Sequence, residues 1–401
     1  MQLLYSLRNS SFAWLWSGQA ISRIGDSFYR IALAWWVLEA TGSATTMGTV
    51  LIFSSVPMLI FLLIGGVTVD RFSRSKIMFA SDIGRGLIIL FIALFAYRGM
   101  LQIWHIYVAS IVFGFVDAFF QPAYSALIPQ VVDQPNLPSA NSLTNLSERL
   151  AGVIGPALGA AIVAAGGTPI AFLLNALTFF VSALCLLPIL NMPVPKAKIE
   201  SDIWQDFRQG FGTVISMPWM WITILIAAIV NITVGSVNGI ATPFLVEERF
   251  GHNVNALGWI VSSISIGSVI TALILGQFKQ IKKRGPIIYF ATILDGIAIF
   301  LMGISTQLWG TLIAGFLCGV GLSIFGLIWL NTLQEKVPQE QLGRVSSIDM
   351  LGSFVLMPVG YGIIGWLTDV SGASTIFIWC GLITILITLL GLFHPAIREL
   401  D

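Results

Sequence analysis

Charged side chains are scarce in this sequence. Of its 401 residues, 10% are Asp, Glu, Lys or Arg and 56% are hydrophobic, whereas a soluble globular domain carries about 25% charged residues. Such a chain cannot cover its surface with polar groups, so most of its outer surface must face lipid. A backbone that faces lipid has to satisfy its hydrogen bonds internally, in helices or in a closed β-barrel.

Short strands of alternating polarity are also missing. The apolar runs are continuous and about 20 residues long, which is the length of a membrane-spanning helix, whereas barrel strands alternate over about 10 residues. The stretch 376–393 is one example of such a run. The sequence therefore predicts an all-α membrane protein.

Signals for a cofactor, a metal or a nucleic acid are lacking as well. The net charge is +1, and no long Lys/Arg block could follow a phosphate backbone. No phosphate-binding loop ends in Gly-Lys-Ser/Thr, which excludes an ATP-driven pump. His105, His252 and His394 lie far apart without metal-ligand spacing. We expect neither an enzyme nor a metal or other cofactor, and no nucleic-acid partner.

Turn residues and charges divide the chain into twelve candidate membrane spans. These are residues 13–38, 45–69, 77–97, 102–126, 141–165, 169–190, 218–242, 254–278, 286–305, 308–332, 345–368 and 374–393. The longest polar segment separates two sets of six spans. We therefore predict an N-terminal bundle (1–190), a cytoplasmic linker (191–217) and a C-terminal bundle (218–401).

The linker has one patterned part. Ile203, Phe207, Phe211 and Val214 recur at a spacing of three to four residues, which predicts a short amphipathic helix. Basic residues gather at the termini and in the even-numbered gaps between spans, while the odd-numbered gaps hold Arg98 and Arg249 alone. Positive charge favours the cytoplasmic side. We expect both termini there.

The two halves resemble each other in their loops. The segment VVDQPNLPSANSL after the fourth span aligns with KVPQEQLGRVSSI after the tenth, and GVTVDRFSR after the second aligns with GQFKQIKKR after the eighth. Many secondary transporters consist of two such repeats that meet at a central site. The repeats indicate two pseudo-symmetric six-helix bundles.

The loop after the second span carries a glycine, an acid and two bases: Gly66, Asp70, Arg71 and Arg74. A glycine lets two helices approach closely, while an acid and a base can pair or cap helix ends at a gate. With this motif the chain resembles the major facilitator superfamily over essentially its whole length, although Ser73 stands where that family usually has glycine. The alternative is an ordinary positively charged turn. Asp349, near the start of the eleventh span, is expected to face the same gate.

Small residues mark the fifth span: Gly152, Gly155, Pro156 and Gly159. They permit close helix packing and resemble the glycine-proline motif of antiporters in the superfamily, although a generic helix contact is the alternative. Together with GQAISRIGDSFYRIALAWWVLEATGSA and FFQPAYSALIPQVV, they resemble the bacterial exporters that include macrolide efflux proteins and the enterobactin exporter. The resemblance implies proton-driven export of a bulky, largely apolar compound.

Several functions remain open at this point. The alternatives to a coupled drug or metabolite exporter are an uncoupled facilitator, a lipid or lysolipid translocator and a siderophore exporter, and a sensor that does not transport is disfavoured. We expect a monomer in the cell membrane whose partners are a small-molecule substrate, protons and the lipid bilayer.

Ionisable residues inside a span are costly unless they are paired or hydrated, so they indicate function. Gln19, Arg23, Asp26 and Arg30 share one stripe of the first helix. Asp26 is the leading proton-coupling candidate, and a static salt bridge is its equal alternative. A second cluster is expected from the depth of its members: Asp82, Arg85, Asp117, Glu148 and Arg149. Its acids Asp117 and Glu148 are the further proton-coupling candidates, and Asp295 in the ninth span has no assigned role.

An aromatic, weakly polar surface is the candidate for substrate binding, because such cavities suit large amphipathic ligands. Besides Gln19, its members in the first half are Trp16, Tyr29, Phe119, Phe120 and Tyr124, and those in the second half are Asn231, Asn238, Trp329 and Asn331.

Overall fold

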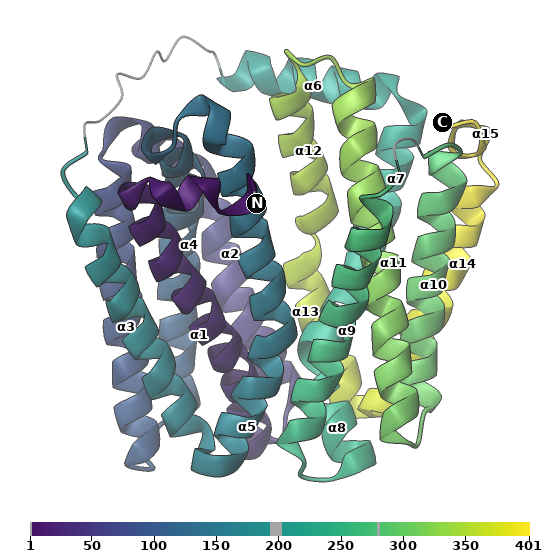
Figure 1. Cartoon of the computed structure of the whole chain (residues 1–401). Coiled ribbons are helices and arrows are strands. Elements are labelled where there is room, and N and C mark those ends of the chain that lie inside the picture. Colours follow the sequence, from purple (N-terminus) through teal and green to yellow (C-terminus); the bar gives the residue numbers. More distant parts are fainter. Residues whose placement is uncertain (1, 193–202, 279–280) are drawn as a thin grey trace. The chain divides into compact units, whose positions relative to one another are not determined.

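The computed structural model describes residues 2–192, 203–278 and 281–401 (Figure 1). Their secondary structure is helical throughout, with turns between the helices. Contacts divide the chain into two compact units. Unit 1 comprises Met1–Gly42 and Thr49–Lys198, and unit 2 comprises Ser43–Gly48 and Ile199–Asp401.

Unit 1 holds the helices of the first half of the chain. They are η1 (Gln2–Arg8), α1 (Ser10–Thr41), α2 (Ala44–Arg71), α3 (Arg74–Tyr97), α4 (Ile103–Val131), η2 (Gln134–Asn136), α5 (Leu137–Leu186) and η3 (Leu187–Ile189). The first residues of α2, up to Gly48, belong to unit 2. The long α5 is bent at Gly167, whose φ of 76° and ψ of 171° are not helical. A residue without a Cβ adopts this conformation at little cost. α5 therefore crosses twice.

Unit 2 holds the second half. Its elements are α6 (Ile203–Ser216), α7 (Pro218–Val230), the π-helix η4 (Asn231–Ala241), α8 (Thr242–Phe250), α9 (Val254–Leu275), α10 (Arg284–Ile304), α11 (Leu308–Lys336), α12 (Leu342–Phe354), α13 (Met357–Ser371), α14 (Ala373–Leu392) and α15 (Pro395–Arg398). The helices α7, η4 and α8 form one continuous rod, and α12 and α13 form another with a break between them.

Within the described residues, ten stretches are long and apolar enough to cross a membrane. One of them, Gln134–Ile189, contains the bend at Gly167 and so holds two crossings. α1 falls outside the ten because Arg23, Asp26 and Arg30 interrupt its apolar sequence. Adding α1 and the second limb of α5 gives twelve crossings, which confirms the predicted fold class.

Each unit has its own apolar core. In unit 1, Phe12, Met78 and Leu127 are fully buried. In unit 2, the core around Met220, Ile288 and Val345 also takes in Val214 of α6. α6 lies across one end of this unit beside the start of α12 (Figure 1).

The broken eleventh crossing departs from the single helix expected over 345–368. α12 ends at Phe354 and α13 begins at Met357, with Pro358 in its first turn. Proline has no N–H and clashes with the preceding turn, so it ends a helix upstream. The Asn231 side chain of η4 donates to the Ser353 carbonyl over 2.9 Å. A carbonyl at the end of α12 is thereby satisfied.

Asp369 near the end of α13 caps the start of α2. Its carboxylate accepts the Ser43 hydroxyl at 2.7 Å and the backbone N–H groups of Ala44 and Thr45 at 2.6 and 3.0 Å. The first N–H groups of a helix have no partner within the helix, and the helix dipole favours an anion there.

We expect Asp369→Ala to destabilise the protein by about 1 kcal/mol, the usual cost of a lost helix cap. The measurement is thermal unfolding of the purified chain in detergent. Asp369→Asn, which keeps an oxygen acceptor, should lose less than Asp369→Ala. Equal stability of Asp369→Ala and the wild type would show that this cap contributes nothing.

Candidate functional site: a charged cavity in unit 1

A cavity of about 480 Å³ lies inside unit 1. Its lining comes from α1, α2, α3, α4 and the first limb of α5, and it includes Tyr29, Ser54, Phe113 and Gln121. Six charged side chains reach the cavity: Arg23, Asp26, Arg30, Arg85, Asp117 and Glu148. The volume is within the range of about 300–1,000 Å³ that is usual for small-molecule sites.

A chain of polar contacts leads from α1 to the cavity wall. Gln19 donates to the Ser182 hydroxyl at 2.9 Å, and Ser182 donates to Asp82 Oδ2 at 2.7 Å. The other oxygen of Asp82 pairs with Arg85 Nη2 at 2.6 Å, and Arg85 Nη1 reaches Asp117 Oδ1 at 3.3 Å. Four crossings are linked by this network.

Arg85 is the centre of that network and is almost entirely buried. Its guanidinium carbon lies 4.0 Å from the ring centroid of Phe120 and 4.6 Å from that of Phe179. Asp82 is 0% exposed, while the Asp117 side chain is 35% exposed. Arg85 thus joins one acid sealed inside the bundle to another that reaches the cavity.

A second ion pair crosses from α1 to α5. Arg23 Nη1 lies 2.8 Å from Glu148 Oε1, and the two side chains are 22% and 41% exposed. The guanidinium also lies 5.3 Å from the Tyr124 ring centroid, and the Tyr124 hydroxyl is within 3.4 Å of Thr144. Glu148 therefore belongs with Arg23, not with the Arg85 network where the sequence placed it.

Asp26 lies between these two systems and joins neither directly. Its side chain lines the cavity, and within residues 2–192, 203–278 and 281–401 it makes no hydrogen bond or ion pair. The expected partners engage other groups, because Arg23 pairs with Glu148 and Arg30 Nη2 donates to Ser27 at 3.2 Å. The expectation of a salt bridge from Asp26 to either flanking arginine is wrong in this conformation.

The charges of this region do not cancel. Three cations and three anions line the cavity, and Asp82 behind Arg85 adds a fourth anion. With all of them ionised, one negative charge is left over. Because an uncompensated charge is costly inside a membrane, the site favours one more proton or one cationic group of a ligand.

The small residues of α5 set the distance between α1 and α5 beside this cavity. A Cβ added at Gly155 would lie 2.4 Å from the Cβ of Ser27, and one added at Gly159 would lie 3.0 Å from the Cα of Phe28. Ser27 also donates to the Ala151 carbonyl at 3.3 Å. Gly152 lines the cavity and Pro156 is buried within the helix. The motif therefore serves close packing beside Asp26.

The aromatic candidates of the first half do not form one surface. Tyr29 lines the cavity and stacks on Phe113 with ring centroids 5.6 Å apart. Trp16 donates to the Ser147 hydroxyl at 2.8 Å, and Phe119 packs against Phe115. The remaining three contact the charged network instead. The Arg85 guanidinium lies over the Phe120 ring and that of Arg23 over the Tyr124 ring, while Gln19 donates to Ser182.

The candidates of the second half are separated as well. Asn238 donates to the Cys318 sulfur at 3.7 Å, and Asn331 lines a different cavity at one end of unit 2. Trp329 donates to Asp349 at 3.0 Å. Asp349 is the eighth residue of α12, which begins at Leu342, so it lies about two turns into the helix and not near its start as expected.

The gate motif is described in part. Gly66 and Asp70 belong to the helical backbone of α2, but the side chain of Asp70 and the surroundings of Gly66 lie outside the described part of the structure. Arg71 ends α2 and is exposed, and Arg74 donates to the Ala126 carbonyl of α4 at 2.8 Å. Arg149 follows Glu148 on α5 but does not line the cavity.

Ser182 is a functional residue that the sequence reasoning missed. It bridges Gln19 and Asp82 although it lies in an apolar span. One signal was available, because Asn175, Thr178 and Ser182 recur at helical spacing. A polar stripe in a membrane helix faces other helices.

The family model of the Major Facilitator Superfamily matches residues 15–361 and, in a second match, residues 224–399. The chain belongs to the major facilitator superfamily. It is a multi-span transporter of the cell membrane with a small-molecule substrate, and not an enzyme.

Relatives of this superfamily member include exporters. Macrolide efflux protein A of Streptococcus pyogenes is 23% identical, with 97% of each chain covered. The enterobactin exporter EntS of Shigella boydii is 25% identical over 91% of this chain and 88% of its own. The solved nucleoside transporter NupG matches with a TM-score of 0.77 at 10% identity, covering 98% of this chain and 100% of its own. This structural likeness shows the fold.

Proposed function

We propose that this transporter is a secondary active exporter of bulky hydrophobic or amphipathic small molecules, driven by proton antiport through alternating access. The efflux names of its relatives support export. The observation that carries proton coupling is the carboxylate of Asp26, which lines the cavity and has no hydrogen bond or ion pair among the described residues, in a region where Asp82 brings the acids to four against three arginines.

Proton and substrate compete for this surplus charge in the proposed cycle. A carboxylate without a partner inside a membrane protein is stabilised by a proton or by a nearby cation. A substrate that carries an amine would displace the proton from Asp26, and protonation on the other side of the membrane would release the substrate. Asp117 and Glu148 are the reserve candidates, because each already contacts an arginine.

The arginines offer the change of partner that two conformations require. Arg23 and Arg30 lie one turn from Asp26 on either side, so a change of side-chain rotamer would bring one of them to an ionised Asp26. Protonation would return Arg23 to Glu148. Arg23 would then have two alternative partners, and the proton and the substrate would each favour one of them. Two ligands that shift the same two-state equilibrium are coupled in free energy.

Three further features belong to this proposal. We propose that Asp70 and Arg71 act in the conformational cycle at a cytoplasmic gate, that both termini are cytoplasmic, and that the chain works as a monomer. The proposed functional halves are 1–190 and 218–401, joined by a linker at 191–217.

The test is a flux assay in proteoliposomes with an imposed pH gradient. Antiport predicts that an acidic lumen drives uptake of the substrate above its outside concentration, because protons leaving the vesicle are exchanged for substrate. The panel should contain cationic hydrophobic drugs, siderophores and lysolipids. Collapse of the gradient by a protonophore is the control.

Each alternative function gives a different result in this assay. Equilibration without accumulation, unchanged by the protonophore, would identify an uncoupled facilitator. Movement of lysolipids alone would identify a lipid translocator, and movement of siderophores alone a siderophore exporter. The absence of flux for every compound would overturn the proposal of transport for this panel.

A further inference from the structure

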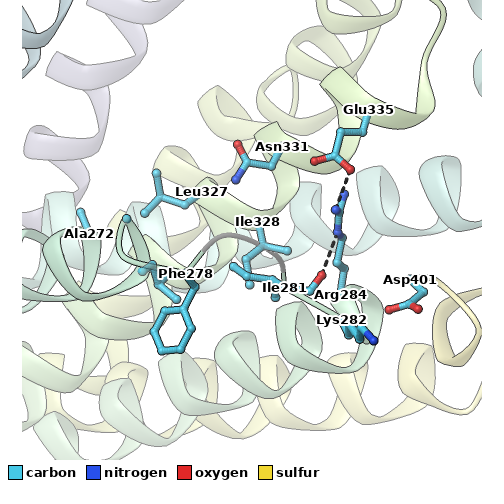
Figure 2. A pocket seen from close by; sticks show the side chains of 12 residues that line it. Ala272, Phe278, Ile281, Lys282, Arg284, Leu327, Ile328, Asn331, Glu335 and Asp401 are labelled. Atoms are coloured by element: carbon cyan, nitrogen blue, oxygen red, sulfur yellow. Dashed lines mark hydrogen bonds and ion pairs between the residues drawn. The ribbon is translucent and has the colours of Figure 1, made fainter.

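A second cavity, of about 560 Å³, lies inside unit 2 (Figure 2). It is formed by the end of α9 and the turn that follows, the first residue of α10, the last turns of α11 and Asp401. The transport proposal uses none of these residues.

The lining changes from apolar to charged along its length. On α11, Leu327 is followed one turn later by Asn331 and another turn later by Glu335, a distance of about 12 Å at 1.5 Å per residue. On the other side, the lining includes Ala272 on α9 and, just before α10, Ile281 and Lys282. A ligand that matches this lining has a polar head and an apolar tail.

Arg284, at the charged end of the cavity, has one hydrogen-bond donor without an acceptor among the described residues. Its Nη2 pairs with Glu335 Oε2 at 2.6 Å and its Nε donates to the Ile281 carbonyl at 3.1 Å, as the dashed lines in Figure 2 show. Its Nη1 is buried and has no hydrogen-bond partner in the described part of the chain. A buried donor without an acceptor is costly, so this atom indicates a missing anion or polar group.

Lys282 supplies a second cation at the same end. It lines the cavity and, among the residues that the structure describes, its ammonium group has no ion-pair partner. The acids of the lining are Glu335, which pairs with Arg284, and Asp401, which accepts the backbone N–H of Lys283. Two cations and two acids line the cavity, so an anionic head is favoured by the donors of Lys282 and Arg284 that have no acceptor among the described residues, and not by net charge.

The surface beside the cavity is apolar and turned outward. Leu273 is 66% exposed and Phe278 is 61% exposed. In a membrane-spanning protein, exposed apolar side chains are suited to contact with acyl chains. A membrane phospholipid is an amphiphile that combines such a chain with a charged head.

We propose that this cavity binds an anionic phospholipid. Its phosphate accepts hydrogen bonds from Lys282 Nζ and Arg284 Nη1, and an acyl chain lies along the apolar wall between Ala272 and Leu327. Basic pockets between membrane helices near the bilayer surface suit such head groups.

The test is lipid binding to the purified full-length chain in detergent, followed by native mass spectrometry. Phosphatidylglycerol should bind at one site per chain and more tightly than phosphatidylcholine. Lys282→Gln should weaken this binding about fivefold, as expected for one basic residue near a membrane surface. The matched control is Lys283→Gln, which removes the same charge from a neighbouring residue outside the cavity lining and should leave the binding unchanged.

Two further arms separate the sources of the phosphate. Ala272→Trp should fill the apolar end and reduce phosphatidylglycerol binding without a change of charge, and inorganic phosphate should compete only weakly. Equal losses in Lys282→Gln and Lys283→Gln, or equal binding of phosphatidylcholine, would overturn the proposal. Competition by inorganic phosphate at the concentration of the lipid would replace the lipid site by a phosphate site and would also overturn it.

Discussion

Asp26→Asn is expected to abolish gradient-driven export while downhill movement of substrate continues. Asparagine fills nearly the same volume but takes up and releases no proton in the physiological range. Asp26 has no hydrogen bond or ion pair among the described residues, so the change breaks no contact of this conformation. The loss should therefore fall on coupling and not on folding.

The measurement for Asp26→Asn is accumulation of substrate in vesicles with an acidic lumen, beside counterflow exchange at equal pH on both sides. Accumulation should drop to the level reached without a gradient, and exchange should remain. The same chemical change at the paired acids, Asp117→Asn and Glu148→Gln, tests the two reserve candidates in the same assay. If Asp26→Asn still concentrates substrate with normal pH dependence, Asp26 is a structural residue and the acid is to be sought at Asp117 or Glu148.

The sequence was sufficient to predict the membrane spans, because each is a local run of apolar residues. In α1, the spacing of the polar residues is more informative than the mean hydropathy of the helix. Its polar stripe removes it from the set of apolar helices, yet Arg23, Asp26 and Arg30 share a face that lines the cavity. The periodicity of a helix alone was enough to place them together.

The pairing of charges could not be predicted in the same way. Glu148 was expected beside Asp82 and Arg85 because all three lie at similar depth, yet it reaches Arg23 instead. Depth follows from the rise per residue, but the direction of a side chain around the bundle depends on how the helices pack. The approach of α1 to α5 at Gly155 and Gly159 brings Arg23 to Glu148.

Irregular backbone within a span could not be predicted from the sequence either. The π-helix Asn231–Ala241 and the break after Phe354 both lie within stretches that read as uniform spans. Pro358 indicates a break, but it does not fix where the last hydrogen bond is lost. That position depends on tertiary contacts such as the one from Asn231 to the Ser353 carbonyl.

Arg85→Gln is expected to destabilise the protein strongly. It leaves Asp82, which is 0% exposed, without a cation, and removing one partner of a buried pair costs about 3–5 kcal/mol. The contacts of the guanidinium with the Phe120 and Phe179 rings are lost as well. The measurements are the yield of monodisperse protein and its thermal unfolding in detergent, and both should fall sharply.

The double variant Asp82→Asn/Arg85→Gln distinguishes a charge effect from loss of packing. Removing both charges leaves no buried ion without a partner, and such replacements are often close to neutral, so the double variant should recover most of the stability that Arg85→Gln loses. Asp117→Asn should cost little, because Arg85 keeps its shorter contact with Asp82 at 2.6 Å against 3.3 Å to Asp117. If the double variant is as unstable as Arg85→Gln, the stability comes from the packing of the Arg85 guanidinium against the Phe120 and Phe179 rings and not from its charge. Recovery of stability in the double variant together with loss of transport would instead assign Arg85 two roles, since the same guanidinium then supports the bundle through Asp82 and acts on the cavity through Asp117.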